Sequence, residues 1–222
     1  MNTQLSAESR MNSSATSART VTLQGQPLAL AGRPPVIDDS APEFSLVFSR
    51  RPEDASADGG FAMPELRQVG LDDYRHRIKL LNIFPSIDTP ICADSVRACE
   101  LFARSHPKHA LLMISADLPF AMQRFCADHS IKNLFALSTM GDTRFGRDYG
   151  VGIDTEPLRG LCARACFVLD SANKVRQGST PFSRTVWKGG LWPAHGASAR
   201  QGFRSHRSLA ASCRPKRANA CC

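Results

Sequence analysis

Short apolar runs alternate with amphipathic stretches through the middle of the chain. Continuous apolar runs of strand length occur at 78–84 and 110–116, as expected for central strands covered on both faces, and 134–138 is a further strand candidate. Between these runs, apolar residues at helical spacing predict helices over 89–104 and 119–129. This order of strand, helix, strand, helix and strand predicts a parallel sheet with right-handed crossovers.

Shorter elements flank this core. An alternating segment that begins at Val21 and contains the turn sequence GQP predicts a β-hairpin. Residues 44–48 form another strand candidate, and 49–61, rich in charged and small residues, reads as a surface loop. Toward the other end of the chain, 164–169 is a strand candidate and 170–174 has the composition of a turn.

The composition divides the chain into one domain and two flanks. A length of 222 residues suits one domain of ordinary size with additional segments. Residues 1–19 contain too few apolar side chains to offset the entropy of ordering, which predicts a disordered extension. We therefore place the folded domain at 20–177. Residues 178–222 are rich in Gly, Ser, Ala, Arg and His, and are predicted to be a disordered or frame-shifted tail.

Charge is distributed unevenly between the domain and the tail. The net charge is +8, from 28 Lys and Arg and 20 Asp and Glu. Eight of the cations lie in 178–222, where no acidic residue occurs, so the remaining cations and acids of the chain balance. A basic tail binds polyanions weakly through counterion release, yet no folded reader of bases accompanies it. We therefore expect no specific nucleic-acid binding, and a tail-driven polyanion binder remains one alternative.

The totals also limit the compartment and the metal chemistry. No apolar run approaches the length that crosses a bilayer, so no membrane span is expected. The first nineteen residues lack the apolar stretch of a secretory signal, which predicts a cytoplasmic protein. The eight cysteines and six histidines show no spacing typical of zinc sites, so neither a metal nor another cofactor is expected.

One cysteine lies where a chain builds a reactive thiol. The apolar run at 78–84 is followed by Pro85, and a helix is predicted to begin near Thr89, three residues before Cys92. The unpaired N–H groups and positive dipole end of such a helix start favour a thiolate. A thiolate is the nucleophile of peroxide, disulfide and acyl chemistry. A buried cysteine acting as a small hydrophobic residue is the alternative interpretation.

These residues resemble a known family. Pro85, Ser86, Asp88, Thr89, Cys92, Ser95 and Arg97 reproduce the pattern P-S-x-D-T-x-x-C-x-x-S-x-R of the bacterial thiol peroxidases, the atypical two-cysteine branch of the peroxiredoxins. The stretches VTLQG, ISADLPFAMQRFC and YGVGIDTEPLRGLCARACFVLD are similar to the same family, so the resemblance covers roughly 20–175. It implies a thioredoxin-like α/β fold with an N-terminal β-hairpin extension. Because the chain diverges from 178 onward, we expect the domain to lack its last strand and its closing helix.

The resemblance also implies roles for individual residues. Cys92 would be the peroxidatic cysteine that attacks a hydroperoxide, and Cys126, in R-F-C, the resolving cysteine that captures the sulfenic acid as a disulfide. Thr89 would orient the peroxide, Arg164 would hold the thiolate and donate to the oxygens, and Pro85 would shield the pocket from water. Thioredoxin is the implied reductant, and a homodimer is the implied assembly. A disulfide needs closer backbones than packed helices allow, which predicts local unwinding.

Other cysteines and the tail leave alternatives open. Cys99 falls on the face of its helix that should be buried, so we assign it no chemistry. Cys162 and Cys166 flank Arg164, and an alternating strand would place all three on one face, either as packed hydrophobic residues or as spare thiols. The divergent end also permits an impaired thioredoxin-fold protein that acts as a redox sensor or scaffold.

Overall fold

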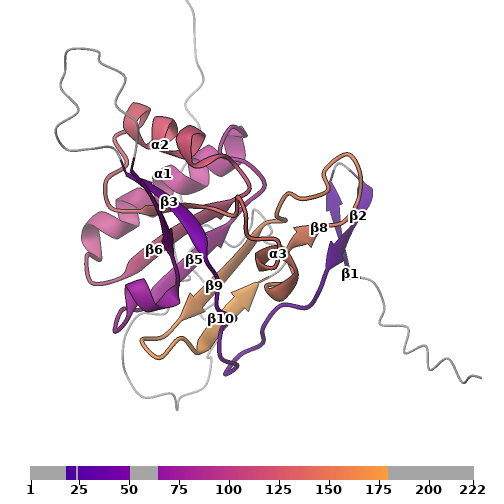
Figure 1. The fold of residues 1–222 in the computed structure, drawn as a ribbon, viewed down its shortest axis with the longest axis horizontal. Helices are drawn as coiled ribbons and strands as arrows, with labels where there is room; N and C mark the ends of the chain where they lie inside the picture. Colours follow the sequence, from indigo (N-terminus) through magenta and orange to yellow (C-terminus); the bar gives the residue numbers. More distant parts are fainter. Residues whose placement is uncertain (1–18, 24, 51–64, 180–222) are drawn as a thin grey trace, which may run out of the picture. The chain divides into compact units, whose positions relative to one another are not determined.

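The computed structural model describes residues 19–23, 25–50 and 65–179. Its strands and helices are, in chain order, β1 (Arg19–Leu23), β2 (Gln26–Ala31), β3 (Leu46–Arg50), β4 (Glu65–Val69), the 3-10 helix η1 (Leu71–Tyr74), β5 (Lys79–Ile83), α1 (Pro90–Ser105), β6 (Ala110–Ser115), α2 (Pro119–Asp128), β7 (Phe135–Ser138), α3 (Phe145–Asp148), β8 (Gly152–Ile153), β9 (Ala165–Leu169) and β10 (Val175–Ser179). The strands form a seven-stranded sheet in the order β10-β9-β5-β6-β7-β3-β4 and a three-stranded sheet in the order β1-β2-β8 (Figure 1).

The centre of the large sheet is parallel, as predicted. β5 pairs with β6 and β6 pairs with β7, both in parallel, and α1 and α2 connect them. Every residue of β5 and β6 is buried because both faces of these strands are covered. One face packs in a cluster that includes the rings of Phe44, Phe145 and Tyr149. The other face carries Asn82, whose side chain reaches Ser95 of α1.

The predicted N-terminal hairpin is present. β1 and β2 pair antiparallel from Arg19 opposite Leu30 to Leu23 opposite Gln26. Gly25 lies in the turn with a φ of 84°, a left-handed conformation that a side chain disfavours. Arg19 already belongs to β1, and its guanidinium donates to the carbonyl oxygen of Gly150 at 2.9 Å.

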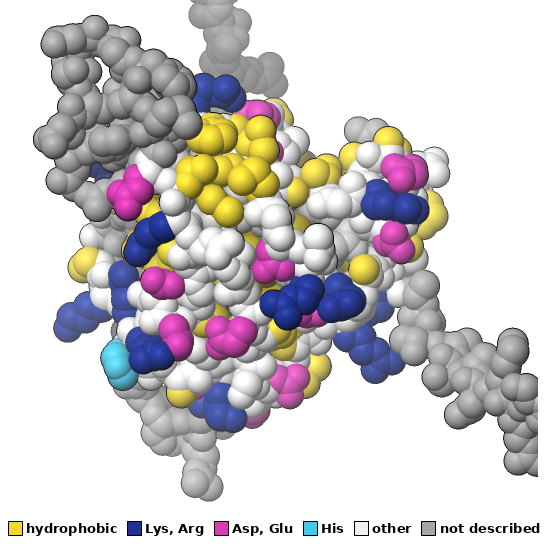
Figure 2. All heavy atoms as spheres, viewed as in Figure 1, with side chains coloured by type: hydrophobic (Ala, Val, Ile, Leu, Met, Phe, Trp, Pro, Cys, Tyr) yellow, Lys and Arg dark blue, Asp and Glu magenta, His cyan; other side chains and the backbone are white. Residues whose placement is uncertain are grey.

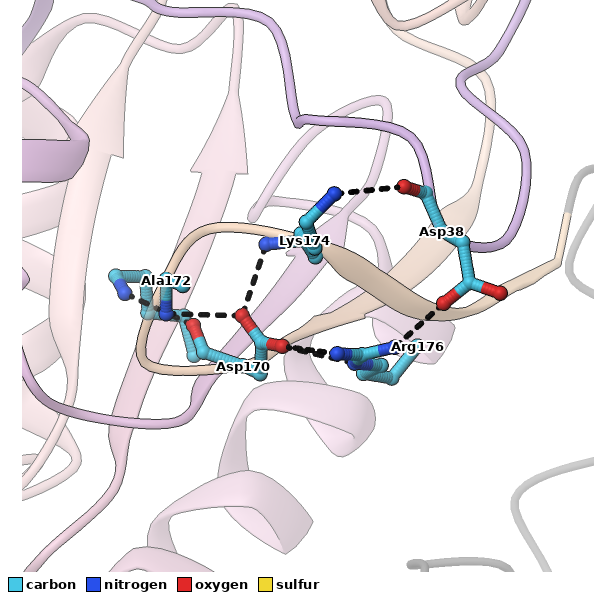
Figure 3. A network of polar contacts seen from close by, with 6 residues as sticks. Asp38, Asp170, Ala172, Lys174 and Arg176 are labelled. Atoms are coloured by element: carbon cyan, nitrogen blue, oxygen red, sulfur yellow. Dashed lines mark hydrogen bonds and ion pairs between the residues drawn. The ribbon is translucent and has the colours of Figure 1, made fainter. Parts of the chain in front are cut away.

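A strand follows β9, and this corrects the expectation that the domain lacks its last strand. β10 pairs antiparallel with β9. In the turn between them, the Asp170 carboxylate accepts hydrogen bonds from the N–H groups of Ala172 and Lys174 at 2.9 Å and from Arg176 Nε at 2.8 Å (Figure 3). Arg176 also pairs with Asp38 at 2.5 Å. These polar contacts hold β10, and an apolar pattern does not reveal them.

Other differences concern the edges of the sheet. The sequence did not predict β4, four of whose five residues are exposed, and β3 continues to Arg50 inside the expected loop. The described residues do not include the rest of that loop, the extension 1–18 or the tail from 180 onward. The tail contains Cys213, Cys221 and Cys222 and is the segment considered as an alternative polyanion binder. Among the helices that the structure describes, none has the length and apolar character of a membrane span.

Candidate active site

Three parallel strands end side by side, and the segments that follow them build the candidate site. Ile83 of β5 pairs with Ile114 of β6, and Ser115 of β6 pairs with Ser138 of β7. The chain then passes from β5 through the loop 84–89 into α1, so that Cys92 lies in the first turn of the helix that follows a central strand. Ligands of open α/β sheets bind at this edge.

Thr89 and Cys92 form the centre of this site. The Cys92 side chain is fully buried. Thr89 precedes α1 as its N-cap, but its side chain makes no capping hydrogen bond. Instead, its hydroxyl oxygen lies 2.8 Å from Cys92 Sγ and 3.1 Å from the carbonyl oxygen of Ser86. The single hydroxyl proton can serve either neighbour, and the first helical turn adds backbone N–H groups without intrahelical partners. A negative charge on this sulfur therefore has donors at hand.

Asp117 holds the loop that precedes α1. Its carboxylate accepts hydrogen bonds from the Ser86 hydroxyl at 2.8 Å, the Ile87 N–H at 2.6 Å and the Ser115 hydroxyl at 2.7 Å. Its backbone carbonyl accepts from the Ser138 hydroxyl at 2.5 Å. One residue thus ties together the segments that follow β5, β6 and β7. This role was not predicted, although a carboxylate directly after the predicted strand 110–116 was the available signal.

Arg164 and Pro85 lie at the same edge of the sheet. β9 runs antiparallel to β5 with Ala165 opposite Ile83, so Arg164 lies beside the end of β5, where Pro85 follows. Arg164 comes directly before the first residue of β9, and Ala165 and Ile83 belong to the cluster on the face away from α1. Arg164 and Pro85 are both half-buried. In the described part of the chain, Arg164 forms no hydrogen bond or ion pair, and none joins it to Cys92.

Cys126 lies in the last turns of α2, as predicted, and is half-buried. Burial, followed by the negative charge of Glu100, raises the pKa of the Cys126 thiol to about 11. Glu100 is itself buried in α1, but N–H groups of Asn133 and Lys132 and the Arg104 guanidinium donate to it. Burial opposes its ionisation and these donors outweigh that cost, so the pKa of Glu100 lies below its ordinary value.

Cys126 lies beside the helical face of α1 that carries Cys92. A small apolar cavity of about 10 Å³ lies between α1 and α2, and Cys126 lines it together with Ile87 and Val96. Val96 is one helical turn after Cys92, on the same buried face of α1. Both cysteines are free thiols. Packed helix axes lie about 8–10 Å apart, whereas a disulfide needs Cα atoms within about 7 Å, so a bond between them requires one segment to unwind.

The remaining described cysteines do not share one face, contrary to the prediction for Cys162 and Cys166. Cys162 packs in the cluster on the face away from α1. Cys166 pairs with Asn82, whose amide lies 3.7 Å from Cys99 Sγ of α1. The alternation fails because β9 begins only at Ala165. Burial raises the pKa of Cys162 and Cys166 to about 12 and that of Cys99 further, which suits the predicted packing role.

Large apolar side chains are exposed around this end of the sheet. Ile91, Leu118, Phe120 and Met140, in and beside the first turns of α1 and α2 and after β7, are between 39% and 56% exposed. Figure 2 shows apolar side chains gathered on the viewed face, over the region where Figure 1 shows α1 and α2. An exposed apolar patch of this kind is typical of a surface that contacts another molecule.

A cysteine in the first turn of a helix, faced by a threonine hydroxyl at the carboxyl end of a thioredoxin-like sheet, defines the peroxiredoxin class of proteins. The Redoxin family model matches residues 37–186, and the chain belongs to this family. A thiol peroxidase of Vibrio cholerae is 36% identical over 151 residues, which cover 68% of this chain and 83% of that protein. The chain thus falls in the thiol peroxidase branch.

Solved structures agree with this placement. A peroxiredoxin-like protein from Aquifex aeolicus is 28% identical with a TM-score of 0.58, over 73% of this chain and 85% of that one. A thiol peroxidase from Chromobacterium violaceum is 26% identical with a TM-score of 0.58, over 72% of this chain and 84% of that one. The thioredoxin-like fold inferred from the sequence is confirmed. Membership of this family supports peroxide reduction by a cysteine thiol.

Proposed function

We propose that this chain reduces hydrogen peroxide and organic hydroperoxides with Cys92 as the peroxidatic cysteine. The observation that carries the proposal is the 2.8 Å contact between the Thr89 hydroxyl and Cys92 Sγ in the first turn of α1. A thiol peroxidase from Vibrio cholerae, 36% identical to this chain, supports the reaction class.

In the first step, the Cys92 thiolate attacks the terminal oxygen of the hydroperoxide. The S–O bond forms as the O–O bond breaks, the sulfur is oxidised to a sulfenic acid, and the departing alkoxide or hydroxide takes up a proton to leave as alcohol or water. Thr89 and the first-turn N–H groups orient the two oxygens, and Arg164 donates to the charge that develops on them. Pro85, which has no N–H group, limits access of water. Arg164 suits this role because it lies at this edge of the sheet and has no hydrogen bond or ion pair among the described residues.

In the second step, Cys126 captures the sulfenic acid. Its sulfur attacks Cys92 Sγ, an S–S bond forms, and the hydroxyl leaves as water. Cys126 lines a small cavity together with Val96, which lies one helical turn after Cys92, and this placement supports the pairing. The pKa of about 11 keeps Cys126 protonated in the resting protein, so unwinding of the α2 end would both shorten the distance and free the thiol to ionise.

A dithiol must then return two electrons to the disulfide, and we propose thioredoxin, in a cytoplasmic setting, as the reductant.

The exposed apolar side chains Ile91, Leu118, Phe120 and Met140 surround the site and support a homodimer that covers them. Sedimentation of the chain against a Phe120→Glu variant tests the dimer: the variant should sediment as a monomer, and an unchanged mass would place the interface elsewhere.

The decisive experiment is consumption of hydrogen peroxide and cumene hydroperoxide with thioredoxin and its reductase. Cys92→Ser should abolish turnover. In Cys126→Ser, one equivalent of peroxide should convert Cys92 to the sulfenic acid, and a second equivalent should then oxidise it to sulfinic acid, seen by mass spectrometry. Cys166→Val, which keeps an apolar side chain in place, is the matched control and should retain turnover.

The outcomes separate the parts of the proposal. Turnover that survives Cys92→Ser would exclude Cys92 as the nucleophile. Turnover unchanged in Cys126→Ser would assign the capture to another thiol. Single-turnover oxidation of Cys92 without recycling by thioredoxin would leave the peroxide step intact and assign the reductant differently.

A further inference from the structure

A second hollow lies at the opposite end of the parallel strands from Cys92. It has a volume of about 460 Å³, within the usual range for small-molecule sites. Arg77 precedes β5, His109 precedes β6, and Asn133 and Leu134 precede β7, so the hollow lies at the amino ends of these strands. Phe48 of β3 and further residues of this edge complete its wall.

The charges that line the hollow have one sign. Arg67, Arg77 and Lys132 line it, and none of the described residues that line it is acidic. Lys132 is exposed, and its ammonium group has no hydrogen bond or ion pair in the described ranges. Arg67 lies over the ring of Phe48 at 5.5 Å and Arg77 over that of Phe135 at 5.6 Å. A guanidinium stacked on a ring keeps its edge for carboxylate or phosphate oxygens.

The negative groups near the hollow are already paired or weakened. Glu100 accepts hydrogen bonds from the backbone N–H groups of Lys132 and Asn133 and is paired with Arg104. Asp73 lies 3.9 Å from Arg67, with both side chains more than a third exposed, so solvent weakens the pair. Arg77 donates to the carbonyls of Pro107, Lys108 and His109, which are neutral. The carboxyl end of α1 borders the hollow at Ala103, but a helix end carries only roughly half an elementary charge, against three cations.

A concave surface lined by one sign of charge concentrates counterions, and a volume of about 460 Å³ suits a small molecule. We propose that this hollow binds a small organic anion that carries phosphate or carboxylate oxygens on a planar group. The oxygens contact Lys132 and Arg67, and the planar group lies against the stacked guanidinium and ring of the wall. This site is separate from the peroxide site, and its existence does not depend on the proposed function.

The test is isothermal titration of the full chain with AMP, inorganic phosphate and uncharged adenosine. AMP should bind and adenosine should not. Lys132→Ala and Arg67→Ala should each weaken AMP binding by about tenfold, the loss of one charged hydrogen bond. Both residues are exposed, so the variants should keep the wild-type melting temperature. Arg159→Ala is the matched control, since Arg159 is 61% exposed, lies outside the hollow and removes the same charge.

Each outcome bears on the proposal. Weakened AMP binding in the two hollow variants with wild-type affinity in Arg159→Ala supports the site. Equal weakening in all three variants would show a general effect of net charge, the tail included, and overturn it, as would the absence of AMP binding. Phosphate that binds as tightly as AMP would overturn the role of the planar group. An oligonucleotide that binds while AMP does not would overturn the preference for a small molecule.

Discussion

The segment that carries Cys92 and the helix that carries Cys126 are held by different kinds of contact. Asp117 fixes the segment before Cys92 through hydrogen bonds of 2.6 and 2.8 Å to Ile87 and Ser86. The α2 end that carries Cys126 rests instead on an apolar cavity wall. Hydrogen bonds fix direction, whereas apolar contacts are non-directional.

This difference suits the two proposed steps. Attack on a peroxide requires a nucleophile held within a fraction of an ångström of its donors. Disulfide formation requires that Cys126 move toward Cys92. Because a cavity lies beside Cys126, fewer van der Waals contacts are lost when it moves. An ion pair also joins the two segments. The Arg124 guanidinium lies 3.9 Å from the Asp88 carboxylate, and both side chains are about two-thirds exposed, so solvent weakens the pair.

The largest expected effect comes from removing the cation that we place on the fixed side. Arg164→Ala should lower the rate of peroxide reduction by roughly 10²-fold to 10³-fold, the usual cost of losing one preorganised donor in a reacting site. Stopped-flow measurement of sulfenic acid formation on Cys92 gives this rate directly.

Arg164→Lys provides the comparison for that variant. It keeps a positive charge and should recover part of the rate, because a point charge lacks the planar fork of Arg164. If Arg164→Ala reacts with peroxide as fast as the wild type, Arg164 does not stabilise the reacting oxygens, although it lies at this edge of the sheet.

A smaller effect is expected from loosening the loop that Asp117 holds. Asp117→Asn removes the negative charge and replaces one acceptor oxygen with a donor, which faces either the Ser86 hydroxyl or the Ile87 N–H and the Ser115 hydroxyl. The hydrogen bonds that hold the loop are therefore weakened. The loop before Cys92 then samples other positions, and the rates of peroxide reduction and of Cys92 alkylation should both fall by roughly tenfold, about 1.4 kcal/mol. Both rates are measured on the same preparation.

Asp170→Asn is the matched control for this change. The Asp170 carboxylate also accepts three hydrogen bonds, but it does so in the β9–β10 turn at the other end of the sheet (Figure 3). Both variants should lose stability on melting, whereas only Asp117→Asn should slow the chemistry of Cys92. Equal rates in the two variants would reduce Asp117 to a structural carboxylate.

The central strands and helices could be predicted from the sequence because their signals are local. The apolar runs of β5 and β6 and the helical spacing of Val96, Cys99 and Ala103 each reflect burial of one segment. Thr89 and Cys92 are three residues apart across a helix start, so their contact also follows from local geometry.

The features that the sequence analysis missed depend on residues far apart in the chain. β4 is exposed and lies in the sheet only by pairing with β3, so no alternation marks it. β10 is held by the pair of Arg176 and Asp38, 138 residues apart. The role of Asp117 likewise appears only when the segments after β5 and β7 meet it. A strand was predicted over 164–169, but β9 begins only at Ala165, and the irregular segment before it, which separates Cys162 from Cys166, was not predicted.

The smallest effect is expected at Cys126, in the helix that apolar contacts hold. Burial is the larger cause of its raised pKa and the charge of Glu100 the smaller one, so Glu100→Gln should lower the pKa only part of the way from about 11 toward its ordinary value. The thiolate fraction, and with it the alkylation rate of Cys126 near pH 8, should then rise severalfold, because reactivity follows the thiolate. In the wild type this rate should increase about tenfold per pH unit until pH approaches 11. Peptide mapping after iodoacetamide treatment measures it, and Cys166, whose pKa is raised by burial alone, is the internal control that Glu100→Gln should leave unchanged. A rate that levels off below pH 9, or that rises equally at Cys126 and Cys166, would mean that loosened packing rather than the Glu100 charge governs the Cys126 thiol. The contrast between Cys92 and Cys126 would then have to rest on packing alone.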